Sequence, residues 1–121
     1  MSGTVRLKTE RNKFRYVLED KTGKVVMNGA FIGEKEKAES YIKRITDDPL
    51  EDYTALMKGP DGKWIFKGFF FSVAAGASDL NVSDSVPLGF SPSKYDTEEE
   101  AQAARQAAIA AAKGSIYVDE T

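Results

Sequence analysis

The strongest constraint in this sequence is a change of hydrophobic period between residues 14 and 45. Phe14, Tyr16 and Leu18 alternate with polar residues, which is typical of a strand with one buried face. Farther along, apolar residues recur at the i, i+3, i+4 and i+7 spacing of a helix with one buried stripe: Ala38, Tyr41, Ile42 and Ile45. The segment therefore predicts strands followed by an amphipathic helix that packs on them.

Turn-forming residues separate the strands that we expect before this helix. Residues 5–8 alternate apolar and basic side chains, and a polar turn at residues 10–12 follows them. A second polar turn, at residues 20–23, ends in glycine, which favours a hairpin loop. The pair Asn28–Gly29 indicates a further turn or a bulge. Three antiparallel strands and one helix are expected from the first 49 residues.

A second copy of this pattern is expected after residue 50. Leu56 and Trp64 take the places of Leu7 and Phe14, the latter pair at an offset of 50 (64 − 14). Downstream, residues 97–100 form a capping box at the start of an alanine-rich helix. A last short strand is expected at residues 115–118.

We therefore predict an α+β fold made of two tandem β(3)-α-β-type repeats. The repeats are expected to form one antiparallel sheet with both helices packed on one face. A single domain spans residues 1–121, with the first repeat at about 4–49 and the second at about 50–121.

The second repeat is longer than the first. Phe31 corresponds to Tyr95 at an offset of 64, so the second copy contains 14 additional residues (64 − 50). We place them in an inserted loop at residues 72–93, which is rich in Ser, Ala, Gly, Asp and Pro. Long loops in compact domains are often functional. An extra hairpin in this region is the alternative.

The candidate interaction surface combines this loop with the polar face of the first two strands. It consists of Ser78, Asp79, Asn81, Asp84, Phe90, Arg6, Lys8 and Arg15. The basic members suggest weak nucleic-acid binding as one alternative. However, the alternation places Phe14 and Tyr16 on the opposite face, where they cannot stack on bases.

The sequence contains no cysteine and no histidine. Disulfides, thiol chemistry, imidazole catalysis and zinc sites built from these residues are therefore excluded. We predict no catalytic residues and no cofactor. The alternative is a small-ligand binder or an enzyme that uses tyrosine, lysine and carboxylate groups.

Charge is distributed unevenly along the chain. Residues 1–46 contain 11 Lys+Arg and 6 Asp+Glu, whereas residues 47–121 contain 6 and 13, giving +5 and −7. Such asymmetry steers association between oppositely charged surfaces, and an inhibitor-like protein that docks on a partner is one reading of it. We expect a protein partner, a monomer with a homodimer as the alternative, no membrane contact and a cytoplasmic location.

Two acidic segments resemble ion sites and have simpler explanations. Residues 79–84 place oxygen ligands at alternate positions, as a calcium loop does. The sixth position is Asp84 instead of glycine, and the twelfth is Phe90 instead of glutamate, so we predict no metal site. Residues 98–100 are three glutamates at a helix start, where they complement the helix dipole.

Several motifs together resemble the YegP-like family. They are residues 13–18, 23–26 and Phe31 with the following helix, and, in the second half, residues 61–66, Tyr95, Thr97 and Ala101. The resemblance implies two β(3)-α-β units that share one sheet and exchange their terminal strands, so that residues 115–118 pair with the first repeat. The insertion and Gly33, in place of a Ser or Thr cap, depart from the family pattern.

The resemblance carries over no catalytic residue. A function is not determinable from the sequence, and we expect a non-catalytic binding or interaction module.

Overall fold

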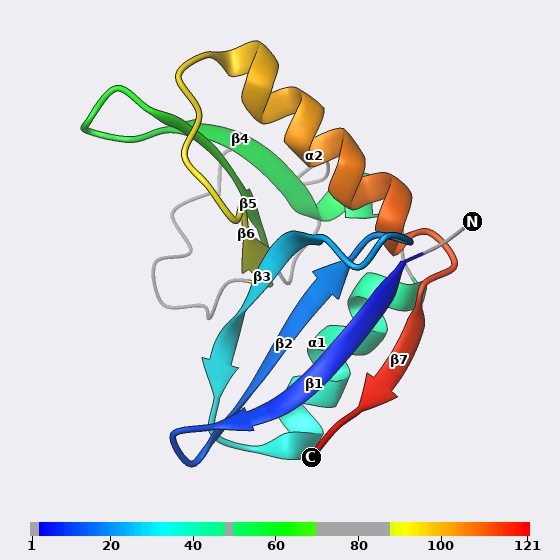
Figure 1. Ribbon diagram of the computed structural model, residues 1–121. Helices are drawn as coiled ribbons and strands as arrows, with labels where there is room; N and C mark the ends of the chain where they lie inside the picture. The colour runs from blue at the N-terminus through cyan, green and yellow to red at the C-terminus, as the bar shows by residue number, and fades with distance from the viewer. Residues whose placement is uncertain (1–2, 48–49, 70–87) are drawn as a thin grey trace.

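Seven strands form one sheet in the order β4-β5-β6-β3-β2-β1-β7 (Figure 1). The computed structural model describes residues 3–47, 50–69 and 88–121. The strands are β1 (Thr4–Glu10), β2 (Lys13–Glu19), β3 (Val25–Ile32), β4 (Thr54–Lys58), β5 (Trp64–Gly68), β6 (Gly89–Phe90) and β7 (Ile116–Asp119). The helices are α1 (Lys35–Asp47), the 3-10 turn η1 (Leu50–Tyr53) and α2 (Glu98–Ala112). The predicted α+β class is confirmed.

The first hairpin follows the predicted alternation. Arg11 and Asn12 both have positive φ, 53° and 64°, as the tight turn between β1 and β2 requires. The turn sets a register in which Val5 lies opposite Leu18 and Leu7 opposite Tyr16. All four of these apolar side chains are fully buried, so one face of the hairpin forms core.

Two bulges shape β3. Between the pairs Arg15–Phe31 and Val17–Asn28, β3 contains one residue more than β2, which confirms the bulge predicted at Asn28–Gly29. A Cβ on Gly29 would lie 2.4 Å from the Tyr16 ring, so the bulge needs glycine where β3 crosses this side chain.

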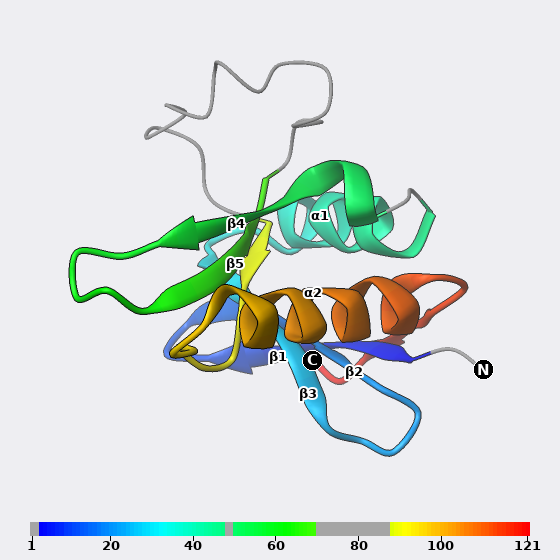
Figure 2. The same cartoon turned by 90° about the horizontal axis from the view of Figure 1, so that it is seen from above.

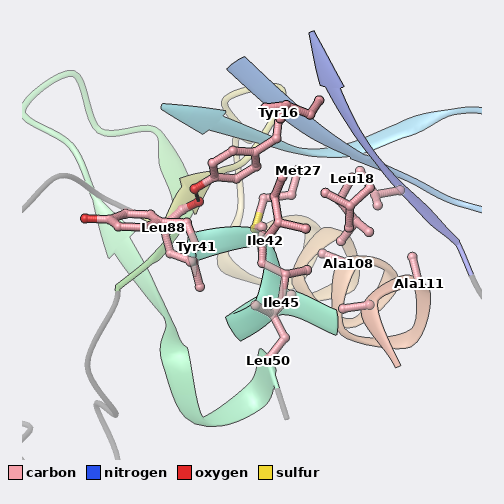
Figure 3. Packing of buried hydrophobic residues seen from close by; sticks show 14 of the residues in the cluster. Tyr16, Leu18, Met27, Tyr41, Ile42, Ile45, Leu50, Leu88, Ala108 and Ala111 are labelled. Carbon is pink, nitrogen blue, oxygen red and sulfur yellow. Dashed lines mark hydrogen bonds between the residues drawn. The ribbon is translucent and has the colours of Figure 1, made fainter. Parts of the chain in front are cut away.

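Both helices pack on the same side of the sheet (Figures 1 and 2). The stripe predicted for α1 is buried as expected, and α2 contributes a stripe of small side chains that includes Ala101 and Ala108. Figure 3 shows core side chains from the strands and from both helices gathered between these layers. Because alanine is short, α2 approaches the sheet closely.

The N-terminus of α2 has the predicted Thr97 cap with a different carboxylate contact. The Thr97 hydroxyl accepts a hydrogen bond from the Glu100 amide at 3.2 Å. The same hydroxyl donates to the Glu100 carboxylate at 3.1 Å. The cap therefore holds Glu100 through the hydroxyl, and not through the Thr97 amide as a capping box predicts.

The last strand corrects one part of the predicted topology. β7 pairs with β1, as expected from the resemblance, but runs parallel to it, so the sheet is mixed and not wholly antiparallel. A helix that returns the chain across the sheet produces a parallel neighbour, whereas a tight hairpin produces an antiparallel one. The alternation of apolar and polar residues is the same in parallel and antiparallel strands, so the sequence did not show the direction of β7.

The C-terminal boundary of the predicted inserted loop, residues 72–93, is wrong. Residues 70–87 lie outside the described residues, but Phe90, which we expected in a loop, belongs to β6. This strand pairs with β5 and with β3. A Cβ on Gly89 would lie 2.8 Å from the Asn28 carbonyl oxygen, so glycine permits this close approach. β4 and β5 pair in continuous register from Thr54–Gly68 to Lys58–Trp64, so this hairpin contains no bulge.

Candidate interaction surfaces

The face of the sheet turned away from the helices carries a continuous row of side chains. Val17 pairs with Asn28, Asn28 with Phe90, Phe90 with Lys67 and Lys67 with Ala55. Neighbouring positions such as Tyr16 and Phe66 are buried toward the helices, and strand alternation directs this row to the opposite side. The row crosses five strands through the middle of the molecule.

Large apolar side chains are exposed on this face, at Phe90 within the row and at Phe31 and Met57 beside it. The exposed fractions are 44% for Phe31, 39% for Phe90 and 37% for Met57. Arg15 lies with its guanidinium carbon 5.6 Å from the centre of the Phe31 ring and donates a 3.1 Å hydrogen bond to Asn28. We call the set Arg15, Phe31, Met57, Ile65, Lys67 and Phe90 the open-face patch. It combines apolar area with cations.

A hollow of about 550 Å³ adjoins the open-face patch. Ile65, Lys67 and Phe90 form one wall of the hollow, and residues 91–94 form the other. Lys94 at this rim donates a 2.8 Å hydrogen bond to Asp61. The hollow gives the patch a concave part.

The structure separates the residues predicted for the interaction surface. Ser78, Asp79, Asn81 and Asp84 lie outside the described residues. Among the others, Phe90 and Arg15 lie in the open-face patch.

Arg6 and Lys8 lie on β1, on the same face of the sheet as Val17 and Arg15, and both are engaged in ion pairs. Arg6 contacts Glu19 at 2.9 Å and Glu120 at 3.0 Å, and Lys8 lies 3.9 Å from Glu120. These contacts raise the pKa of Arg6, and the hydrogen bond that Arg6 donates to Glu19 is the largest cause. Glu19 and Glu120 thus neutralise two of the basic side chains that suggested nucleic-acid binding.

Four members of the open-face patch were not predicted: Phe31, Met57, Ile65 and Lys67. For Phe31 a signal was present in the sequence, because a bulge at Asn28–Gly29 shifts the alternation and turns Phe31 to the open face. Met57, Ile65 and Lys67 carry no comparable signal, since their exposure depends on which face the helices cover.

A second hollow lies between the edge strand β4 and the first turn of α2. Its volume is about 770 Å³, and its lining consists of Leu56, Thr97, Glu98, Glu99 and Gln102. We call it the β4–α2 groove. Arg105 closes one end of this edge, because its guanidinium donates to the Thr54 hydroxyl at 2.9 Å and to the Glu51 carbonyl at 3.0 Å.

The opposite edge of the sheet is covered by β7, which side chains fasten to α1. Lys35 lies 2.7 Å from Asp119, and the Tyr117 hydroxyl donates to Glu39 at 2.8 Å. The Lys35 ammonium lowers the pKa of Asp119 to about 2, with a smaller contribution from Thr121. Burial and the Glu39 carboxylate raise the pKa of Tyr117. We call this set the β7 docking site.

Tyr16 is a buried group with a strongly shifted pKa, and its role is structural. Burial raises the pKa of Tyr16, and its hydroxyl donates a hydrogen bond to the Leu88 carbonyl. This bond ties β2 to the residue before β6 across the sheet.

Within residues 3–47, 50–69 and 88–121, no group of three or more acidic or metal-binding side chains is arranged around a common point. Among the same residues, neither helix combines the length and apolar character needed to cross a bilayer.

Comparison with solved structures identifies the architecture. The protein of unknown function yegP from E. coli, solved by NMR in solution, has a TM-score of 0.77 at 20% identity, over 100% of this chain and 95% of that one. A UPF0339 protein from Shewanella oneidensis has a TM-score of 0.74 at 19% identity, over 98% and 92% of the two chains. This chain has the YegP-like fold. The predicted resemblance is thus confirmed at the level of the fold.

The other comparisons add no activity. No family model and no curated protein matches the sequence. The E. coli neighbour is described as a protein of unknown function, so the function has to be argued from the surfaces of this chain.

Proposed function

We propose that this protein is a non-catalytic interaction module that binds a protein partner through the open-face patch. The observation that carries the proposal is the exposure of Phe31 and Phe90 on one face of the sheet, beside a hollow. Exposed aromatic side chains in a contiguous surface are characteristic of protein interfaces. Arg15 and Lys67 border them, so the complementary partner surface is apolar with acidic groups around it.

A protein partner fits this surface better than a single-stranded nucleic acid. Stacked bases and phosphates require aromatic rings together with a run of available cations. Here Glu10 lies 3.5 Å from Arg15, and Arg6 and Lys8 contact glutamates farther along the same face. The chain as a whole has a net charge of −2, which repels a polyanion.

We further propose that the two halves are tandem repeats related by an approximate two-fold axis. Leu7 opposite Tyr16 corresponds to Leu56 opposite Phe66. Val17 opposite Asn28 corresponds to Lys67 opposite Phe90. Asn28 and Phe90 are then equivalent residues, and they pair with each other at the centre of the sheet. A two-fold axis between β3 and β6 requires this self-pairing.

These pairings change one equivalence that we predicted. Phe14 lies opposite Ile32, and Trp64 lies opposite Tyr95. Tyr95 therefore corresponds to Ile32 and not to Phe31, at an offset of 63 (95 − 32). The same offset relates the helix starts, because the Ala38 amide donates to the Glu34 carbonyl and the Ala101 amide to the Thr97 carbonyl.

The proposed function is tested by affinity capture from the source cell with matched surface variants. The double variant Phe31→Ser/Phe90→Ser removes the aromatic area and leaves the core in place. Ile116→Ser is the control, because Ile116 is 61% exposed on β7 at the edge of the sheet, away from the patch. We expect a protein retained by the wild type and by the control to be lost by the double variant.

Two outcomes would contradict the proposal. Equal capture by the double variant and the wild type would exclude the open-face patch as the contact surface. Retention of a single-stranded oligonucleotide that falls steeply with salt and disappears in the double variant would assign the same face to nucleic acid. Sedimentation of the purified protein tests the expected monomer at the same time.

A further inference from the structure

The β4–α2 groove occupies the place in the second half that β7 occupies in the first. In the proposed repeat, Leu56 corresponds to Leu7, which lies opposite Asp119 of β7. The helix offset of 63 equates Lys35 with Glu98 and Glu39 with Gln102. Lys35 and Glu39 hold β7, whereas Glu98 and Gln102 line the β4–α2 groove. The two sites are therefore built from equivalent positions.

We propose that the β4–α2 groove binds a short extended polypeptide segment with a basic side chain. The segment adds to the edge of β4, parallel to it, as β7 adds to β1. Its lysine or arginine lies opposite Leu56 and contacts Glu98 and Glu99. No described strand pairs with this edge of β4, so its backbone groups are available for strand addition.

Charge decides which segment fits. Asp119 of β7 contacts Lys35, but the equivalent position in the second half is Glu98, so the sign required of the bound strand is reversed. A β7 strand from a second copy would place Asp119 against Glu98 and is disfavoured. The occupant is consequently a different polypeptide with a basic residue at this position.

Arg105 limits the length of the contact. One of its amino groups lies 3.4 Å from the Thr54 carbonyl oxygen, which is the first position at which a strand would pair. The open part of the edge runs from Leu56 to Lys58, so the site accommodates a few residues only. Such a contact is weak by itself and adds to a larger interface.

The experiment uses the full chain and a defined probe. The probe is the heptapeptide Thr-Val-Thr-Lys-Thr-Val-Thr with blocked ends, and the same peptide with glutamate at the fourth position is its counterpart. Titration is followed by ¹⁵N–¹H NMR. We expect the lysine peptide to shift the amides of residues 56–58 and 98–102, with the glutamate peptide binding about tenfold more weakly.

Four variants of the chain isolate the groove. Glu98→Lys removes the preference for the lysine peptide, and Glu98→Gln reduces it, because Glu99 still contributes its charge. Glu36→Lys makes the same charge change in the first turn of α1, outside the groove, and keeps the wild-type preference. Phe31→Ser/Phe90→Ser also binds the lysine peptide normally, because the open-face patch is a separate surface.

The proposal is overturned by any of four results. They are no binding at millimolar peptide, equal binding of the two peptides, shifts located at β7 or on the open-face patch, or an unchanged preference in Glu98→Gln. A spin label on the peptide tests direction. An amino-terminal label broadens the amides near residues 53–54 if the strand is parallel, and those near residues 58–59 if it is antiparallel.

Discussion

The two outer edges of the sheet have the same construction and a different environment. β1 and β4 each begin a hairpin with the same pairing, Leu7 opposite Tyr16 and Leu56 opposite Phe66. At one edge β7 covers Leu7, which is fully buried. At the other, Leu56 is only partly buried and lines the β4–α2 groove. The presence of a covering strand thus makes Leu7 a core residue, and its absence leaves Leu56 on a surface that can bind.

The difference arises from the segment that comes after each helix. After α2 the chain turns back and adds β7 to the first half, with the Ile116 amide donating to the Gly3 carbonyl. After α1 the chain passes through η1 directly into β4. The segment after α2 therefore supplies an edge strand to the first half, whereas the segment after α1 begins the hairpin of the second half. Connectivity, and not strand composition, leaves β4 as an edge.

The largest expected effect comes from truncating the equivalent leucines. Leu7→Ala removes a side chain enclosed by sheet, helix and β7, so we expect a loss of about 3 kcal/mol in the free energy of unfolding. Leu56→Ala removes a partly exposed side chain, and about 1 kcal/mol is expected. Urea unfolding at equilibrium measures both values. Equal losses would mean that β7 does not distinguish the two edges.

A smaller effect is expected from Arg105, which closes the start of the β4 edge. Arg105→Ala leaves the buried Thr54 hydroxyl without this donor and frees the Glu51 carbonyl, so we expect a loss of roughly 1–2 kcal/mol. Amide exchange should accelerate in β4 and stay unchanged in β7. Arg105→Lys keeps the charge but not the forked contacts, and should recover only part of the loss.

If Arg105→Ala instead changes the free energy of unfolding by less than about 0.5 kcal/mol, the guanidinium contacts contribute little to stability. The edge of β4 would then be open along its whole length. In that case the peptide contact in the groove would extend to Thr54, and a longer peptide would bind more tightly than the heptapeptide.

The local structure of the helices was predictable from the sequence because it depends on neighbours along the chain. The stripe of α1 follows from helical spacing, and Ala38, Ile42 and Ile45 are buried as expected. Thr97 caps α2 through contacts three residues away. Helical spacing and cap contacts of this kind involve residues that are only a few positions apart in the sequence.

The surfaces were less predictable because they depend on distant pairings. Phe90 lies at the centre of the sheet only because β6 pairs with both β3 and β5. Arg6 is neutralised by Glu120, which lies 114 positions away. The direction of β7 depends on where α2 returns the chain. None of these relations leaves a local pattern in the sequence.

The smallest expected effect tests how β7 is fastened. Contact with Lys35 lowers the pKa of Asp119 from its ordinary 3.8 to about 2 in the folded protein. Folding therefore favours the charged carboxylate. Its contribution to stability is complete above pH 4 and decreases as the pH falls toward 2. Asp119→Asn should lower the urea midpoint slightly at pH 5 and leave it unchanged near pH 2.

Lys35→Met provides the matched control, because it removes the other half of the pair. Combined with Asp119→Asn it should add little to either single change at pH 5. Both substitutions should accelerate amide exchange in β7 and leave β4 unaffected, since β4 lies at the other edge of the sheet. A midpoint difference that persists at pH 2 would mean that Asp119 acts through its hydrogen bonds to Thr121 and not through its charge.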